Sequence, residues 1–193
     1  MTAAARPIAT TRSTSGMPTG RLGVWWVIVS EIVIFGGLLA SYIMFRLAHD
    51  AWSAQAAHTN TWVGAANTFV LLTSSLFAVL GHKAAEEGDG KKAANMLLLT
   101  ALGGATFIVI KSFEWAYEIS HGFTITSSTF WSFYYTAAGL HALHVIGGVV
   151  IMLIVQAAAR RNEELQRVEL IGLYWHFVDV VWIFLFPLLY IAK

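Results

Sequence analysis

Seven side chains that can carry a charge or bind a proton lie inside long apolar stretches of this sequence: Glu31, Lys111, Glu114, His141, His144, His176 and Asp179. At the centre of a lipid bilayer a charged side chain costs roughly 2.5–3.5 kcal/mol or more on insertion scales. Ionisable residues in such surroundings face the interior of a helix bundle and pair with one another. We therefore predict that these residues form a polar network with a functional or structural role.

The spacing of the histidines allows three kinds of site. His141 and His144 are three residues apart, as are His176 and Asp179, so each pair lies on one face of a helix. Histidines near carboxylates could bind zinc or a di-iron centre, could relay protons, or could form a hydrogen-bonded network between helices. A di-iron centre takes two Glu-x-x-His motifs and no second one accompanies these residues, so the residue types favour the hydrogen-bonded network.

The depth of each residue in the bilayer indicates which side chains meet. A helix rises about 1.5 Å per residue, which places Glu31 and His176 at a similar depth of roughly 12 Å from the inner side. An unpaired carboxyl group in hydrocarbon is costly. We therefore expect Glu31 to hydrogen-bond to a histidine of the fourth apolar stretch, with His144 the better candidate. We expect His176 and Asp179 to face inward and to have hydrogen-bond partners.

A second polar group lies on one face of the third apolar stretch, nearer its outer end. Lys111, Glu114 and Glu118 occupy positions i, i+3 and i+7. We expect Lys111 to neutralise part of the charge of Glu114. We expect Glu118 to reach the membrane interface.

The elements that must position these side chains are transmembrane helices. Hydrophobic residues make up 57% of the chain and charged residues 12%, against about 25% charged in an ordinary soluble domain. Five apolar stretches, each near the roughly 20 residues that span a bilayer, cover residues 23–47, 62–82, 93–119, 129–159 and 168–191. We predict an all-α integral membrane bundle of five transmembrane helices over residues 23–193, preceded by a polar tail over residues 1–22.

Charge predicts the orientation and excludes some partners. Nine Lys and Arg residues fall in the tail, the second loop and the fourth loop, against two on the opposite side, which predicts a cytoplasmic N-terminus in a bacterial inner membrane. The alternative is a mitochondrial inner membrane, with the Arg- and Ser-containing tail as a transit peptide. The net charge of +1 gives no sign of a nucleic-acid partner, and the absence of cysteine excludes disulfides and thiolate metal sites.

Four of the five stretches carry motifs of a known family, in the same order. Residues 174–182 read YWHFVDVVW, residues 139–148 read GLHALHVIGG, residues 30–38 contain SE followed by FGGL, and residues 114–125 contain EWAYE followed by FTI. Over about residues 20–193 the chain resembles subunit III of the haem–copper cytochrome oxidases. The five predicted helices match the shorter bacterial form, which lacks the first two helices of the seven-helix form.

The resemblance implies an accessory, non-redox subunit of a proton-pumping oxidase that reduces dioxygen to water. The haems and copper would lie in partner subunits, and this chain would stabilise subunit I, support proton uptake and hold phospholipid. The implied partners are subunit I, other oxidase subunits, membrane lipids and a respiratory supercomplex. By the same resemblance Glu31 corresponds to a carbodiimide-reactive glutamate, the signature residues His141, His144, His176 and Asp179 are mainly structural, and Lys111 replaces the family's usual Gln.

Two other functions remain open from the sequence. One is the homologous subunit of a quinol oxidase or nitric-oxide-reductase system, although a glutamate at position 31 instead of aspartate favours cytochrome c oxidase. The other is a free-standing membrane metalloenzyme that uses the His/Glu cluster. If the chain is an oxidase subunit, we expect it to dock on subunit I through its first and third helices, whose glycine pairs 36–37 and 103–104 permit close approach.

Overall fold

The computed structural model describes residue 16 and residues 18–49 and 52–192. Most of the predicted polar tail, residues 1–15 and 17, lies outside the described residues. The first helix begins at Thr19, four residues before the predicted start of the first span. The preceding residue, Pro18, caps the helix start and has an extended backbone, and the last turn of the helix contains Arg46.

The structure is all-helical in its described residues, as predicted, and five of its helices are long and apolar enough to cross a membrane. Asn60, Asp89 and Ser128 accept hydrogen bonds from backbone N–H groups in the first turns of three of them, which satisfies donors that a helix start leaves free. The elements are α1 (Thr19–Ala48), α2 (Trp52–Ala56), α3 (Thr61–Glu86), α4 (Gly90–Ser120), α5 (Thr129–Ala159), α6 (Gln166–Phe186) and a π-helical turn, η2 (Pro187–Ile191).

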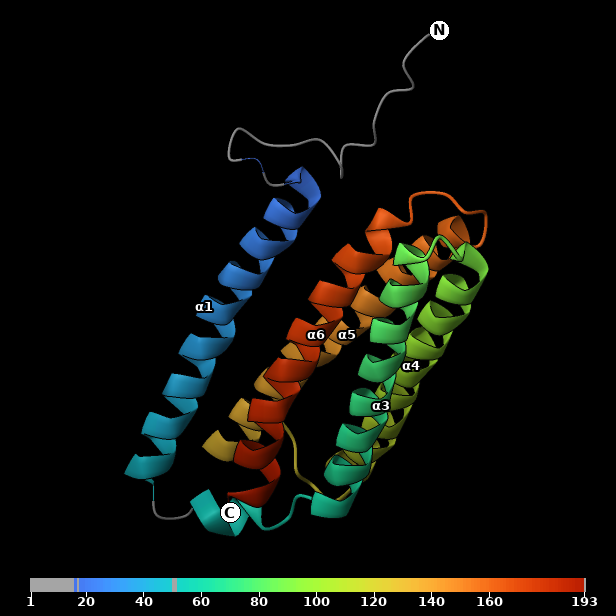
Figure 1. The fold of residues 1–193 in the computed structure, drawn as a ribbon. Helices are drawn as coiled ribbons and strands as arrows, with labels where there is room; N and C mark the ends of the chain where they lie inside the picture. The colour runs from blue at the N-terminus through green and yellow to red at the C-terminus, as the bar shows by residue number, and fades with distance from the viewer. Residues whose placement is uncertain (1–15, 17, 50–51, 193) are drawn as a thin grey trace, which may run out of the picture.

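Helices α3, α4, α5 and α6 form an antiparallel bundle, and α1 lies on one side of it against α6 and α5 (Figure 1). The core of this bundle is aromatic, with Trp131, Trp175 and Trp182 each at most 1% exposed. Helix α1 buries little by comparison, since only Ile28, Phe35 and Tyr42 are buried along its length. The apolar surface of α1 is therefore left for lipid or for another protein chain.

The segments that carry most of the Lys and Arg residues gather at one end of the bundle. The start of α1, the α3–α4 loop and the α5–α6 loop lie together there, whereas α2 and the last turn lie at the opposite end (Figure 1). In the α5–α6 loop the Asn162 side-chain oxygen accepts a hydrogen bond of 2.9 Å from the Gly90 backbone N–H, which ties this loop to the start of α4.

Glycines bring α4 close to its neighbours inside the bundle. A Cβ atom at Gly103 would lie 2.5 Å from Ser74, and one at Gly104 would lie 2.5 Å from the Trp175 ring. The pair at 103–104 is therefore occupied by contacts within the chain, so the expectation that it faces a partner subunit is wrong. A Cβ atom added at Gly36 or Gly37 on α1 would meet no atom of another described element within 4 Å, so this face remains open to a partner.

Candidate functional site

Glu31 of α1 meets His144 of α5, as the sequence predicts. Glu31 Oε2 lies 3.1 Å from His144 Nε2, and both side chains are mostly buried, at 16% and 17% exposure. The two atoms are within ion-pair distance, but the angles do not satisfy the criteria of a hydrogen bond. The edge of the Phe35 ring packs against the imidazole, with 5.3 Å between the ring centroids.

The second nitrogen of His144 determines how many protons the pair holds. His144 Nδ1 lies 2.8 Å from the Leu140 carbonyl oxygen, which can only accept, so Nδ1 carries a hydrogen. Nε2 then has a hydrogen only if the imidazole is charged. The contact with Glu31 is favourable when one proton lies between Nε2 and the carboxyl group, on either side.

His141 points away from His144 into the centre of the bundle. Its ring is fully buried and stacks on Trp182 at 5.0 Å between centroids, with Phe107 edge-on at 5.4 Å. Neither ring nitrogen has a hydrogen-bond partner within the part of the chain that the structure describes. His141 and His144 therefore contact different helices and do not form one site.

His176 and Asp179 face inward on α6, and the histidine forms a hydrogen bond through one ring nitrogen. The Ser75 hydroxyl of α3 lies 2.6 Å from His176 Nδ1. Asp179 is 4% exposed, and among the described residues neither of its carboxylate oxygens meets hydrogen-bond geometry, although it interacts with Ser75. The hydrogen bond expected for Asp179 therefore stays a prediction, with Ser75 as the candidate partner.

The second polar group is more extensive than predicted. Lys111 and Glu114 form the expected i,i+3 ion pair at 3.0 Å, and both are buried. Tyr134 of α5 and Tyr190 of η2 join them, since both hydroxyl groups contact Lys111 Nζ. Glu118 is 3% exposed and accepts a hydrogen bond of 2.9 Å from Tyr134, so the expectation that it reaches the interface is wrong.

The two tyrosines were not identified from the sequence because a tyrosine in an apolar helix resembles an ordinary core aromatic residue. One signal was available. Tyr134 lies near the outer end of the fourth stretch and Lys111 near the outer end of the third, so the hydroxyl group is at a depth at which it can reach the amine. Tyr190 gives a weaker signal, because Pro187 changes the helix geometry just before it.

The predicted network is thus divided into separate groups. Glu31 and His144 lie between α1 and α5, His176 contacts α3, and the Lys111 cluster occupies the end of the bundle near α2. The described residues contain no group of three or more His, Asp or Glu side chains placed to hold a metal ion.

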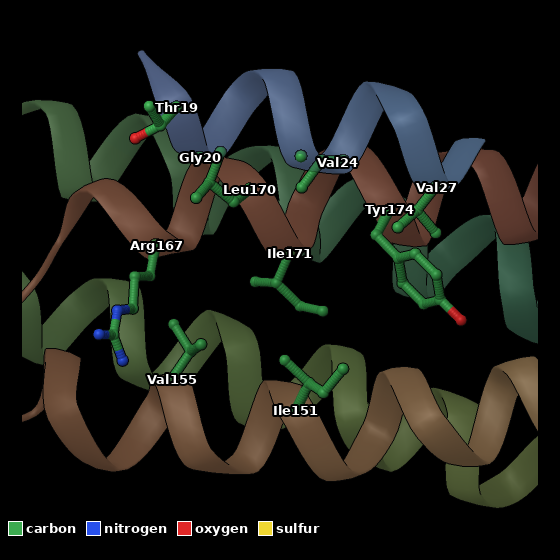
Figure 2. Close-up of a pocket in the computed structure, with 11 residues that line it drawn as sticks. Thr19, Gly20, Val24, Val27, Ile151, Val155, Arg167, Leu170, Ile171 and Tyr174 are labelled. Atoms are coloured by element: carbon green, nitrogen blue, oxygen red, sulfur yellow. The ribbon is translucent and has the colours of Figure 1, made fainter. Parts of the chain in front are cut away.

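An apolar groove runs between α1, α5 and α6 at the end of the bundle that carries the loops. Its volume is about 450 Å³, and its lining includes Val24, Val27 and Ile151. Arg167 lies at one end of the groove and Tyr174 at the other (Figure 2). The arginine side chain also pairs with Glu164 at 2.7 Å.

Comparison with known proteins gives a consistent result over nearly the whole chain. The family described as Cytochrome c oxidase subunit III matches residues 8–193. The chain is 33% identical to Cytochrome c oxidase subunit 3 of Thermostichus vulcanus, over 88% of this chain and 86% of that protein. It is 35% identical to Cytochrome c oxidase subunit 3 of Corynebacterium diphtheriae, over 84% and 83%. It is also 28% identical to Heme-copper oxidase subunit I+III of Aeropyrum pernix, over 89% of this chain and 22% of that protein.

Proposed function

Since this chain belongs to the cytochrome c oxidase subunit III family, we propose that it packs against subunit I of its oxidase, stabilises that subunit and sustains its proton uptake. The chain is a multi-pass membrane protein and an accessory subunit of a cytochrome c oxidase. Subunits of this family carry no redox cofactor, so the haems and copper belong to its partners. The match over residues 8–193 is the observation that carries this proposal.

Direct contact with subunit I is supported by the relative from Aeropyrum pernix. Its printed name joins subunits I and III, and this chain matches 22% of its length. A single chain that joins two subunits keeps them adjacent in the membrane. We therefore take subunit I as the main partner, with other oxidase subunits and a respiratory supercomplex as the wider assembly.

Helix α1 is the proposed docking surface. Its face around Gly36 and Gly37 is open, and a groove of about 220 Å³ between α1 and α6 runs beside it, lined by Ile32, Phe35 and Phe184. Small residues let a transmembrane helix of another chain approach closely. Since the lining is apolar, the interface would form by packing within the membrane.

The pair Glu31–His144 is the proposed proton-active group of this chain. The Glu31 carboxyl group lies 3.1 Å from the His144 imidazole, and both side chains keep some exposure through which a proton could exchange. Protons are scarcest at high pH, where a group that collects them helps most. The proposed orientation, with the N-terminus in the cytoplasm of a bacterium, places this pair on the side from which the oxidase takes up protons.

The groove with Arg167 is the proposed phospholipid site. The resemblance implies that the first two helices of the seven-helix form make one wall of the family's lipid-holding cleft, and the apolar space between α1, α5 and α6 is the candidate site in this chain. Acyl chains suit its apolar walls, and a phosphate group suits the guanidinium at its mouth. Arg167→Gln should reduce the phospholipid that copurifies with the oxidase, whereas Arg160→Gln in the neighbouring loop should not.

Removal of the subunit tests the proposed function. The oxidase purified without this chain should reduce dioxygen at first, since no redox ligand is lost, and should then fail sooner during sustained turnover at high pH. Oxygen consumption over many turnovers measures this. Immediate loss of the haem spectrum would contradict an accessory role, and an unchanged rate and lifetime would contradict the role in proton uptake.

A further inference from the structure

The cluster around Lys111 is separate from the Glu31–His144 pair and has no part in the function proposed above. It joins three elements, because Glu114 and Glu118 lie on α4, Tyr134 on α5 and Tyr190 on η2. We propose that Glu118 is a buried proton-binding site, which holds its proton in the resting protein and exchanges it at the end of the bundle near α2.

The hydrogen bonds around Lys111 suit a charged ammonium group. An ammonium group has three N–H donors, and Lys111 Nζ faces three acceptors: Glu114 Oε2 at 3.0 Å, the Tyr134 hydroxyl at 2.9 Å and the Tyr190 hydroxyl. A neutral amine would need a donor for its lone pair. The tyrosine hydrogens are not available for this, because Tyr190 donates to Glu114 Oε1 at 2.8 Å and Tyr134 donates to Glu118 Oε1 at 2.9 Å.

With Lys111 charged, one carboxylate is balanced and the other is not. Glu114 forms the ion pair with Lys111. The groups that face Glu118 are Lys111 and Glu114 on its own helix, Tyr134 and Tyr135 on α5 and Tyr190 on η2, so the described residues supply no second cation. An uncompensated buried charge is strongly destabilising, and a negative charge in the last turn of a helix is further disfavoured by the helix dipole.

Glu118 also has a position for the proton. Its second oxygen, Oε2, lies 3.4 Å from the Tyr135 hydroxyl, whose own hydrogen is donated to the Phe123 carbonyl at 2.7 Å. A proton on Glu118 Oε2 can therefore be donated to the lone pair of the Tyr135 oxygen. Tyr135 is only half-buried, so through it the Glu118 carboxyl group contacts a side chain that is partly exposed, which offers the proton a route of exchange.

Infrared difference spectroscopy of the purified oxidase tests this by counting protonated carboxyl groups. The wild type should show a carbonyl band of protonated glutamic acid that shifts in D₂O and on labelling of glutamate with ¹³C. Glu118→Gln should lose this band. Glu114→Gln should lose it too, because Glu118 must then ionise to balance Lys111. Lys111→Gln should gain a second band, since neither carboxylate then has a counter-charge.

Two further variants keep the test decisive. Glu163→Gln, an exposed glutamate of the α5–α6 loop, should leave the band unchanged. Tyr135→Phe retains the aromatic ring and should shift the frequency of the band, because it removes the acceptor of the proton on Glu118 together with the hydrogen bond to the Phe123 carbonyl. The proposal is overturned if the wild type lacks the band or if Glu118→Gln retains it. If Glu118→Gln does not assemble, an unchanged frequency of the band in Tyr135→Phe overturns the proposal.

Discussion

At the scale of single residues, Tyr190 connects the end of the chain to the interior of the bundle. Its hydroxyl donates to Glu114 at 2.8 Å and accepts from Lys111, and the residue is fully buried. Tyr190→Phe should lower the free energy of unfolding by about 1–3 kcal/mol, because a charged donor and a carboxylate oxygen both lose their partner. Thermal unfolding of the purified oxidase measures this.

The matched control for Tyr190 is Tyr174→Phe. Tyr174 is only partly buried, and its hydroxyl makes one long hydrogen bond of 3.3 Å to the His144 carbonyl. Its loss should cost less than half as much. Equal effects of the two substitutions would show that the Lys111 cluster adds no stability beyond an ordinary tyrosine hydrogen bond.

The contact of Glu31 with His144 predicts energetic coupling. Glu31→Ala and His144→Ala should each destabilise the chain, and the double variant should be less destabilised than the sum by about 1–2 kcal/mol, as expected for residues in contact. Thermal unfolding of the four proteins gives this coupling free energy. Glu31→Ala combined with His121→Ala, an exposed histidine at the far end of α4, should be additive, and coupling there would point to a general loss of stability.

At the scale of helices, the glycines of α4 set how closely α6 can pack. A Cβ atom at Gly104 would lie 2.5 Å from Trp175 and 2.7 Å from Val149. Gly104→Ala should therefore destabilise the bundle by about 1–3 kcal/mol through overpacking. Gly139→Ala on α5 meets nothing within 4 Å among the described residues and should change stability by less than about 0.5 kcal/mol. Thermal unfolding compares the two, and equal effects would contradict this packing.

Gly37 predicts a different outcome, because its surface is open. Gly37→Leu should leave the helix content of the chain unchanged and should weaken its retention in the oxidase, if α1 docks on subunit I. Subunit stoichiometry after purification measures this, with circular dichroism as the control for folding. Full retention of the Gly37→Leu chain in the oxidase would show that this face of α1 is not the interface with subunit I.

The long helices were predictable because each spans a long, mostly apolar run; the fourth, Thr129–Ala159, has the predicted bounds, and the fifth span ends at the predicted residue 191. The ends of the first three helices and the start of the fifth were set too short. The helices were placed by their apolar stretches, and polar first and last turns, such as the one ending at Glu86, lie outside these stretches although their backbone is helical. Helix α2 was missed because its five residues are too few to give a periodic pattern.

The candidate site was only partly predictable because depth and spacing do not specify direction. Residues three apart on a helix are offset by about 60° around its axis, which is enough for His144 to face α1 while His141 faces α4 and α6. The Glu31–His144 contact was predictable because both residues share a depth and an isolated carboxyl is costly. The partners of Lys111 depended on how α5 and η2 pack, which the sequence does not state.

At the scale of the whole molecule, the charges predict how the bundle lies in the membrane. Seven of the nine cations counted for the inner side are described, and they lie near the start of α1 and the two loops that share one end of the bundle: Arg21, Lys83, Lys91, Lys92, Arg160, Arg161 and Arg167. At the other end Arg46 is the only Lys or Arg among the described residues outside the buried cluster. Positive loops stay in the cytoplasm, so the loop end should be cytoplasmic and α2 should be external.

The chain contains no cysteine, so a single substitution gives one site for labelling. Ala57→Cys, after α2, and Glu87→Cys, in the α3–α4 loop, are both exposed positions at opposite ends of the bundle. A maleimide that cannot cross membranes should label Ala57→Cys in intact spheroplasts and should label Glu87→Cys only after permeabilisation. The reverse pattern would invert the bundle and would place the Glu31–His144 pair on the side away from proton uptake, which would also remove the basis for its proposed role.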